Sequence, residues 1–150
     1  MPVIIHEIYI EASPIICFDL ARNVEVHTQT TARTKEKAVG GVTSGLLEKG
    51  DRVTWGATHF GVKQKLTAEI IAMDIPHSFT DIMVKGAFHS FNHKHEFIQN
   101  GTGTVMKDTF GYKAPLGILG KAADKLFLEN YMRKFIISRA VELKKLAERS

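Results

Sequence analysis

Residues 121–148, KAADKLFLENYMRKFIISRAVELKKLAE, decide the fold, because this stretch contains neither glycine nor proline. Its apolar side chains recur at the three- and four-residue spacing of one helix face. The pattern predicts a single helix about 40 Å long, since each helical residue rises 1.5 Å. A compact chain of this size has a radius of gyration of about 15 Å, so the helix must cross the whole molecule. The apolar stripe and its flank consist of Leu128, Met132, Phe135, Ile136, Leu143, Leu146, Ala147, and of Ala123, Phe127, Tyr131 and Val141.

Glycine marks the organisation of the rest of the chain. All 12 glycines lie between Gly40 and Gly120, so a glycine-punctuated middle separates a glycine-free start from a glycine-free tail. Asn100-Gly101 is the strongest hairpin signal in this middle. Five runs at hairpin spacing predict an antiparallel meander of strands. These runs are residues 51–60, 62–73, 77–85, 88–99 and 103–114.

The start of the chain predicts one more strand and two short helices. Residues 3–11 are rich in β-branched side chains, and Ser13-Pro14 is the pair that opens a helix as N-cap and first helical residue. We expect one helix from Ile15 to Arg22 and a second near Val24 to Thr31. A seventh strand is expected within Glu36 to Glu48.

A long helix with a wide apolar face can be buried against strands about 30 Å long only if their sheet curls around it. We therefore predict an α+β fold, in which a seven-stranded antiparallel sheet curls around the long C-terminal helix and two short helices follow the first strand. No internal repeat or linker interrupts the sequence, so residues 1–150 are expected to form a single domain.

This order of elements resembles the helix-grip fold of the START-like (SRPBCC) superfamily, which includes polyketide cyclase/dehydratase-like proteins and the birch-pollen-allergen type. The resemblance spans nearly the whole chain and implies a ligand cavity between the sheet and the last helix. It does not fix an activity, because carriers, receptors, cyclases and oxygenase domains share this fold. The runs that carry it are 53–55 (VTW) through 59–62 (HFGV), 79–81 (FTD) through 86–88 (GAF), 93–97 (HKHEF) and 115–117 (PLG).

The sequence differs from two branches of this superfamily, which narrows the choice among its members. Oxygenase members of the superfamily hold a Rieske cluster on two cysteines and two histidines, which the single Cys17 cannot supply. Residues 45–51 (GLLEKGD) also differ from the glycine-rich loop of the plant allergen type. We expect no cofactor.

Strand alternation indicates which side chains face the helix. In residues 88–98 the even-numbered positions include the charged Lys94 and Glu96, so these positions are expected to face solvent. The odd-numbered positions are then expected to face inward. The expected inward residues of this and three further strands are His89, Phe91, His93, His95, Phe97; Val53, Trp55, Ala57, His59; Phe79, Asp81, Met83; and Thr104, Met106, Asp108, Phe110, Tyr112.

The polar minority of these inward residues is the main functional signal. Burying them in a dry core costs several kcal/mol unless each finds a partner or water. Either they form a satisfied structural network, or they line a cavity for a small hydrophobic or amphipathic ligand, which is our leading hypothesis. The candidate ligand-binding residues are the apolar Trp55, Phe79, Phe91, Phe110, Met132 and Phe135, and the polar His59, Asp81, His93, His95, Asp108 and Tyr112.

Enzymatic chemistry is the alternative. His93, His95 or His59 could act with Asp108 as general acid or base in a cyclase, dehydratase or hydrolase. His93-x-His95 also places two imidazoles on one strand face, with His59 or Asp108 as a third metal ligand. Because such spacing is common by chance, we expect no metal site. A nucleophilic mechanism has little support, since no G-x-S-x-G motif occurs and Cys17 lies in an apolar run.

The net charge of +4 is confined to one segment. Residues 121–150 contain eight basic and four acidic side chains, so the first 120 residues are neutral. We therefore expect no nucleic-acid partner, although the basic outer face of the last helix leaves docking to a protein partner or an anionic membrane surface as a third hypothesis. For Arg139, beside the apolar stripe, snorkelling to solvent is a simpler expectation than contact with an acidic ligand.

The start of the chain does not indicate targeting or membrane insertion. His6, Glu7 and Glu11 interrupt its apolar residues, no basic segment precedes them, and no run approaches 18 apolar residues. With a single cysteine, this predicts a cytoplasmic protein without stable membrane insertion. The sequence indicates no oligomeric state.

Overall fold

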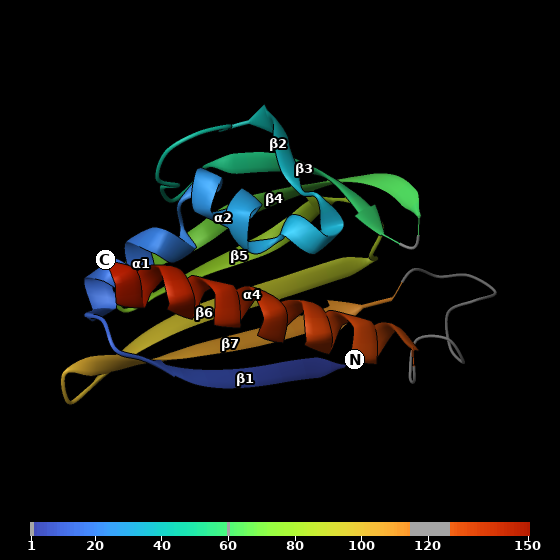
Figure 1. Cartoon of the computed structure of the whole chain (residues 1–150). Helices are drawn as coiled ribbons and strands as arrows, with labels where there is room; N and C mark the ends of the chain where they lie inside the picture. The colour runs from blue at the N-terminus through green and yellow to red at the C-terminus, as the bar shows by residue number, and fades with distance from the viewer. Residues whose placement is uncertain (1, 60, 115–126) are drawn as a thin grey trace.

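The computed structural model of the chain describes residues 2–59, 61–114 and 127–150. Seven of its segments are strands of one antiparallel sheet (Figure 1). They are β1 (Val3–Ile10), β2 (Lys37–Gly41), β3 (Arg52–His59), β4 (Val62–Asp74), β5 (Ser78–Lys85), β6 (Ser90–Asn100) and β7 (Gly103–Lys113). The spatial order is β1-β7-β6-β5-β4-β3-β2. Strands β3 to β7 therefore form the predicted meander, with β1 added beside β7 and β2 beside β3.

The turn between β6 and β7 shows why the meander could be predicted. Gly101 has a φ of 60°, in the left-handed region that glycine adopts without steric cost. Asn100 and Gly103 pair directly across this turn, as the Asn-Gly signal predicts. The register that the turn sets continues along β6 and β7, so His95 pairs with Asp108 and Phe97 pairs with Met106.

The helices lie together on one side of the sheet (Figure 1). Helix α1 (Pro14–Ala21) begins with Pro14 in its first turn, as predicted, and helix α2 (Val24–Thr30) is capped by Asn23, whose Oδ1 accepts from the Val26 amide at 3.1 Å. A short 3-10 helix, η1 (Ala32–Thr34), leads into β2. The long C-terminal helix, α4 (Glu129–Arg149), runs across the sheet; its predicted beginning at 121–126 lies outside the described residues.

The predicted alternation is wrong at the start of β6. His89 is exposed, whereas Phe88 packs with the rings of Phe91 and Phe110. Residues 86–89 form bends, and the strand begins only at Ser90. Because side chains alternate between faces only where the backbone is extended, the pattern of β6 does not reach back to these two residues.

The core is formed between the sheet and the inner side of α4. Cys17 and Phe18 of α1 are fully buried here, together with Phe97 and Met106 of the sheet. The buried residues of α4 recur at helical spacing, in agreement with most of the predicted stripe, and are Met132, Ile136, Ala140, Leu143 and Ala147. Within the described ranges, no helix is long and apolar enough to cross a membrane.

The two faces of β6 give the first prediction. Phe97 is 2% exposed and packs against Phe18 and Phe79, with ring centroids 5.4 and 6.1 Å apart, whereas Ile98 is 50% exposed. Phe97→Ala is expected to lower the free energy of unfolding by about 3–5 kcal/mol, because it leaves a cavity in the core. Ile98→Ala should change it by less than about 0.5 kcal/mol. Denaturant unfolding of both variants measures the difference, and equal losses would contradict the assignment of inner and outer faces.

Candidate functional site

A cavity of about 500 Å³ lies between the inner face of the sheet and α4. This volume is within the range of pockets that hold small organic molecules. Aromatic side chains make much of its wall, with Met132 on the helix side. The predicted site residues that line the cavity are Trp55, His59, Phe79, Asp81, Phe91, His93, His95, Asp108, Phe110, Met132 and Phe135.

Tyr112 is predicted from the sequence to line the cavity, but it is not among the described residues that form the cavity wall. It is fully buried, and its ring packs against Phe88 at 5.5 Å and Phe110 at 5.7 Å between centroids. Tyr112 thus belongs to the core beside the cavity. Alternation places it correctly on the inner face but cannot distinguish a packed position from a lining one.

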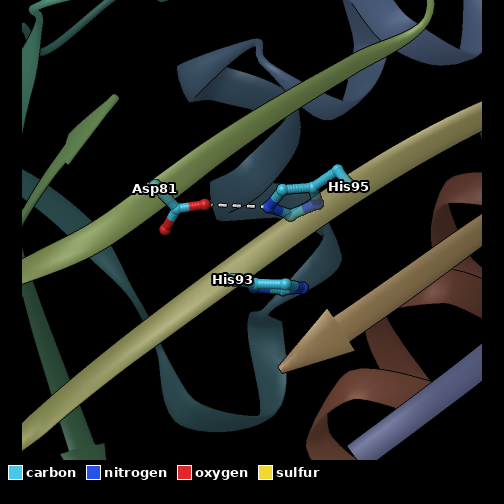
Figure 2. Close-up of side chains that lie close together, drawn as sticks. All are labelled: Asp81, His93 and His95. Carbon is cyan, nitrogen blue, oxygen red and sulfur yellow. Dashed lines mark hydrogen bonds and ion pairs between the residues drawn. The ribbon is translucent and has the colours of Figure 1, made fainter. Parts of the chain in front are cut away.

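Four of the lining residues form a hydrogen-bonded cluster of two carboxylates and two imidazoles: Asp81, His93, His95 and Asp108. They come from three adjacent strands, since Asp81 lies on β5, both histidines lie on β6 and Asp108 lies on β7. His93 Nε2 donates to Asp108 Oδ1 at 2.8 Å, and His95 Nε2 donates to Asp81 Oδ1 at 2.9 Å. His95 Nδ1 lies 3.3 Å from the same Asp108 oxygen. Figure 2 shows three of these side chains, with Asp81 directed at His95.

The rings of this four-residue cluster are also packed against one another. The imidazoles of His93 and His95 are stacked, with ring centroids 3.8 Å apart. The ring of Phe79 also stacks on the imidazole of His95, with centroids 4.2 Å apart. In the register, Asp81 lies opposite His93 across β5 and β6, and His95 lies opposite Asp108 across β6 and β7. The hydrogen bonds of His95 to Asp81 and of His93 to Asp108 therefore join diagonal neighbours, two residues along from the opposed positions. Both opposed and diagonal positions on adjacent antiparallel strands lie within reach of long or aromatic side chains.

Burial and the carboxylates act in opposite directions on the histidines of the cluster. Burial disfavours a charged His95, but hydrogen bonds with Asp108 and Asp81 outweigh it, so the pKa of His95 is raised. Burial lowers the pKa of His93, and the positive charge of His95 lowers it further. Hydrogen bonds with the imidazoles outweigh burial for both acids, so the pKa values of Asp81 and Asp108 lie below their usual range.

The charge of the four-residue cluster follows from these directions. Both ring nitrogens of His95 face carboxylate oxygens, an arrangement in which both nitrogens carry hydrogen. In the protonation state that this hydrogen bonding favours, the cluster holds two carboxylates, one imidazolium and one neutral imidazole, a net charge of −1. The cavity is therefore apolar over most of its wall and negative at this end.

A second histidine–carboxylate pair lines the cavity, and sequence reasoning missed it. His27 of α2 donates through Nε2 to Glu36 Oε1 at 2.8 Å, and Thr34 donates to the other oxygen of Glu36 at 3.1 Å. The imidazole of His27 also stacks on the indole of Trp55, with centroids 3.9 Å apart. His27 lies in a predicted helix, and Glu36 lies at the first position of the range in which the seventh strand is expected, just before β2 begins at Lys37. Alternation along the strands therefore gave no signal for either residue.

Two residues of α4 also contribute to the polar lining. The hydroxyl of Tyr131 is hydrogen-bonded to Nδ1 of His59 at 2.6 Å, and this bond connects the end of β3 to the helix. Arg139 lines the cavity and donates through Nη2 to the Ala21 carbonyl at 3.1 Å. Its Nε is buried with no hydrogen-bond partner in the described part of the chain. Arg139 therefore contributes to the cavity wall, which the snorkelling expectation did not include.

The sheet order, the single-sided helices and the long C-terminal helix define the helix-grip fold of START-like (SRPBCC) proteins, as predicted. The structure is similar to the protein TTHA0849 from Thermus thermophilus, with a TM-score of 0.80 and 23% identity over 96% of this chain and 95% of that one. It is also similar to a START superfamily protein from Mycobacterium smegmatis, with a TM-score of 0.76 and 11% identity over 98% and 97% of the two chains.

A plant protein has the same fold. Ginseng major latex-like protein 151 from Panax ginseng matches with a TM-score of 0.71 and 16% identity, over 97% of each chain. No protein-family model and no curated protein matches the sequence. At these identities the likenesses establish the fold, and the function has to be argued from the site.

The stack of His27 on Trp55, the one tryptophan of the chain, gives a prediction on pH. Burial and the nearby positive charge of Arg139 lower the pKa of His27 below its ordinary 6.5, although Glu36 opposes this shift. We expect the fluorescence of Trp55 to change with a midpoint below pH 6.5 as His27 gains its proton. His27→Gln should remove the transition, and a midpoint at or above 6.5 would contradict the buried pair.

The same shift has a defined effect on stability. The unfolded chain binds the proton of His27 more tightly than the folded chain, so the contribution of His27 to the free energy of unfolding falls as the pH drops below 6.5. In His27→Gln this part of the pH dependence should be absent, which denaturant unfolding at pH 7 and pH 5 would measure.

Proposed function

We propose that the protein binds a small amphipathic molecule in the cavity between its sheet and α4. The apolar body of the ligand lies against Trp55, Phe79, Phe91 and Phe110, and its polar group lies toward the four-residue cluster. The observation that carries the proposal is a mainly apolar cavity with a charged, hydrogen-bonded cluster in its wall. Ligand pockets typically combine apolar walls with a few fixed polar groups whose pKa values are shifted.

The cost of the cluster supports a binding role. Two carboxylates and an imidazolium lose much of their hydration in this interior, and a buried ion pair rarely stabilises a fold more than apolar side chains of the same size. A core selected for stability alone would therefore favour apolar residues at these positions. Their presence at the edge of an open space is accounted for by a polar group that binds there.

The charge of the cavity limits the kind of polar group. The four-residue cluster carries −1, while Glu36 and Asp51 are offset by Arg139 and Lys65, so the polar lining as described is negative. A further anionic group would meet repulsion in a medium of low dielectric constant. We propose a ligand with a neutral hydrogen-bonding group or a cationic group, on an apolar or aromatic body.

The outer face of α4 supports a small molecule over nucleic acid as the partner. Two of its basic side chains are paired with acids of the same helix, Lys144 with Glu148 at 2.7 Å and Lys145 with Glu142 at 3.2 Å. Paired charges of alternating sign are typical of a solvated helix face and do not form the dense basic surface that binds phosphates.

A blocked cavity tests the proposal. Ala57 of β3 lines the cavity, whereas Ala72 of β4 is exposed outside it. Ala57→Phe places a ring in the cavity, and Ala72→Phe adds the same ring to the surface. A thermal-shift screen of lipids, quinones and aromatic polyketides should give compounds that stabilise the wild type and Ala72→Phe, by about 2.7 kcal/mol at 100 times the dissociation constant. Ala57→Phe should lose this stabilisation.

Two results would contradict a binding role. One is stabilisation of Ala57→Phe equal to that of the wild type, which would place the compound elsewhere. The other is a screen without any stabilising compound, combined with native mass spectra that show the purified chain alone. Chemical conversion of a bound compound, lost in His93→Gln, would instead support the acid–base enzyme.

A further inference from the structure

Three side chains of the four-residue cluster bring metal-ligating atoms together. Asp81 of β5 offers a carboxylate oxygen, and His93 and His95 of β6 each offer a ring nitrogen. These three atoms all lie within 4.8 Å of one another (Figure 2). The sequence points to the His93-x-His95 spacing but not to this third residue, because Asp81 lies on a different strand and joins the histidines only through the sheet register.

The spacing of the three atoms is close to that of a metal site. Bonds from zinc or similar metals to nitrogen and oxygen are about 2.0–2.2 Å long, so two donors in a tetrahedral site are about 3.3–3.6 Å apart. The three atoms lie within 4.8 Å of one another, so their widest separation exceeds the tetrahedral spacing by at most about 1.5 Å. Binding of a metal at this site therefore requires rotations of the three side chains that bring their ligating atoms closer together.

Asp108 occupies the position of an outer carboxylate in such a site. Its Oδ1 is 2.8 Å from His93 Nε2 and 3.3 Å from His95 Nδ1. In metal sites the second ring nitrogen of a ligating histidine typically donates to a carboxylate, which fixes the tautomer and the ring orientation. For His95 the roles of the two ring nitrogens are clear: Nδ1 faces Asp108, the outer carboxylate, while Nε2 faces Asp81 and is the nitrogen that would bind the metal.

The charge of the cluster favours a divalent cation. Two carboxylates and two imidazoles face one another in an interior of low dielectric constant, where an excess negative charge is costly. A divalent cation bound by both imidazoles in their neutral form balances the two carboxylates. It takes the place of the proton that His95 Nε2 donates to Asp81, and that proton leaves to solvent.

We propose that Asp81, His93 and His95 bind a divalent transition metal, of the class of Zn²⁺ or Fe²⁺, with Asp108 orienting the imidazoles. Two histidines and one carboxylate are a ligand set of catalytic metal sites, which keep at least one coordination position open. All four residues line the cavity, so the open position faces the space in which a ligand would lie. This metal site goes beyond the proposed binding function and differs from the sequence-based expectation of no metal.

His59 is not part of this site. The sequence made it a possible third ligand, but in the structure its Nδ1 is engaged with the hydroxyl of Tyr131 and its ring lies next to Phe135. His59 is thus a negative control on the same cavity, together with the pair of His27 and Glu36.

Cobalt provides the test. The full chain is stripped with a chelator, dialysed and titrated with Co²⁺, whose visible absorption reports coordination by protein ligands, and then with Zn²⁺ as competitor. We expect one equivalent to bind to the wild type and to His27→Gln and Glu36→Gln. Asp81→Asn and His93→Gln should lose stoichiometric binding, and Asp108→Asn should weaken it about 10- to 100-fold, as outer carboxylates do.

Two results would overturn the metal site. One is the absence of stoichiometric Co²⁺ binding to the wild type. The other is binding that Asp81→Asn and His93→Gln retain, which would place the metal on exposed histidines such as His77 and His89. If these variants do not fold, X-ray absorption of the wild-type Zn²⁺ complex provides the test, because it counts the imidazole ligands of the metal. Two imidazole ligands would support the site, and fewer would contradict it. None of these measurements needs the proposed ligand, so their failure leaves the binding function to its own test.

Discussion

The apolar face of α4 can leave water only against the inner face of the sheet, and the other features of the molecule depend on this constraint. A sheet of seven strands is wider than one helix, so inner side chains that do not reach the helix border a space beside it. Large aromatic rings fill part of that space and leave a cavity of about 500 Å³. The fold thus provides an internal site before any residue of that site is specified.

The polar residues of the cavity are best understood from their hydrogen bonds. His95 is held between two carboxylates, one from each neighbouring strand, and Asp108 contacts both imidazoles. Every charged group of the four-residue cluster therefore has a partner, which makes its burial tolerable. Its excess negative charge is not balanced within the cluster. Without a metal this excess disfavours an anionic ligand group, and a bound divalent metal removes the excess.

Sequence patterns predicted the fold well, because its elements are specified locally. Asn100-Gly101 sets the last hairpin, and period-two alternation places His93, His95 and Asp108 on the inner face. Patterns failed where contacts depend on how separate elements pack. His27 and Glu36 meet only because α2 lies against the start of β2 and β3, and neither has a periodic neighbour that would reveal its direction.

A crystal structure of the purified protein tests the central claim most directly, that the space between the sheet and α4 is a binding cavity. We expect an open cavity of about 500 Å³ with the two histidines of β6 hydrogen-bonded to Asp81 and Asp108 in its wall. Electron density for a bound molecule inside it would identify the occupant. A collapsed interior, in which α4 packs on the sheet and the four residues are sealed from any open space, would contradict the claim.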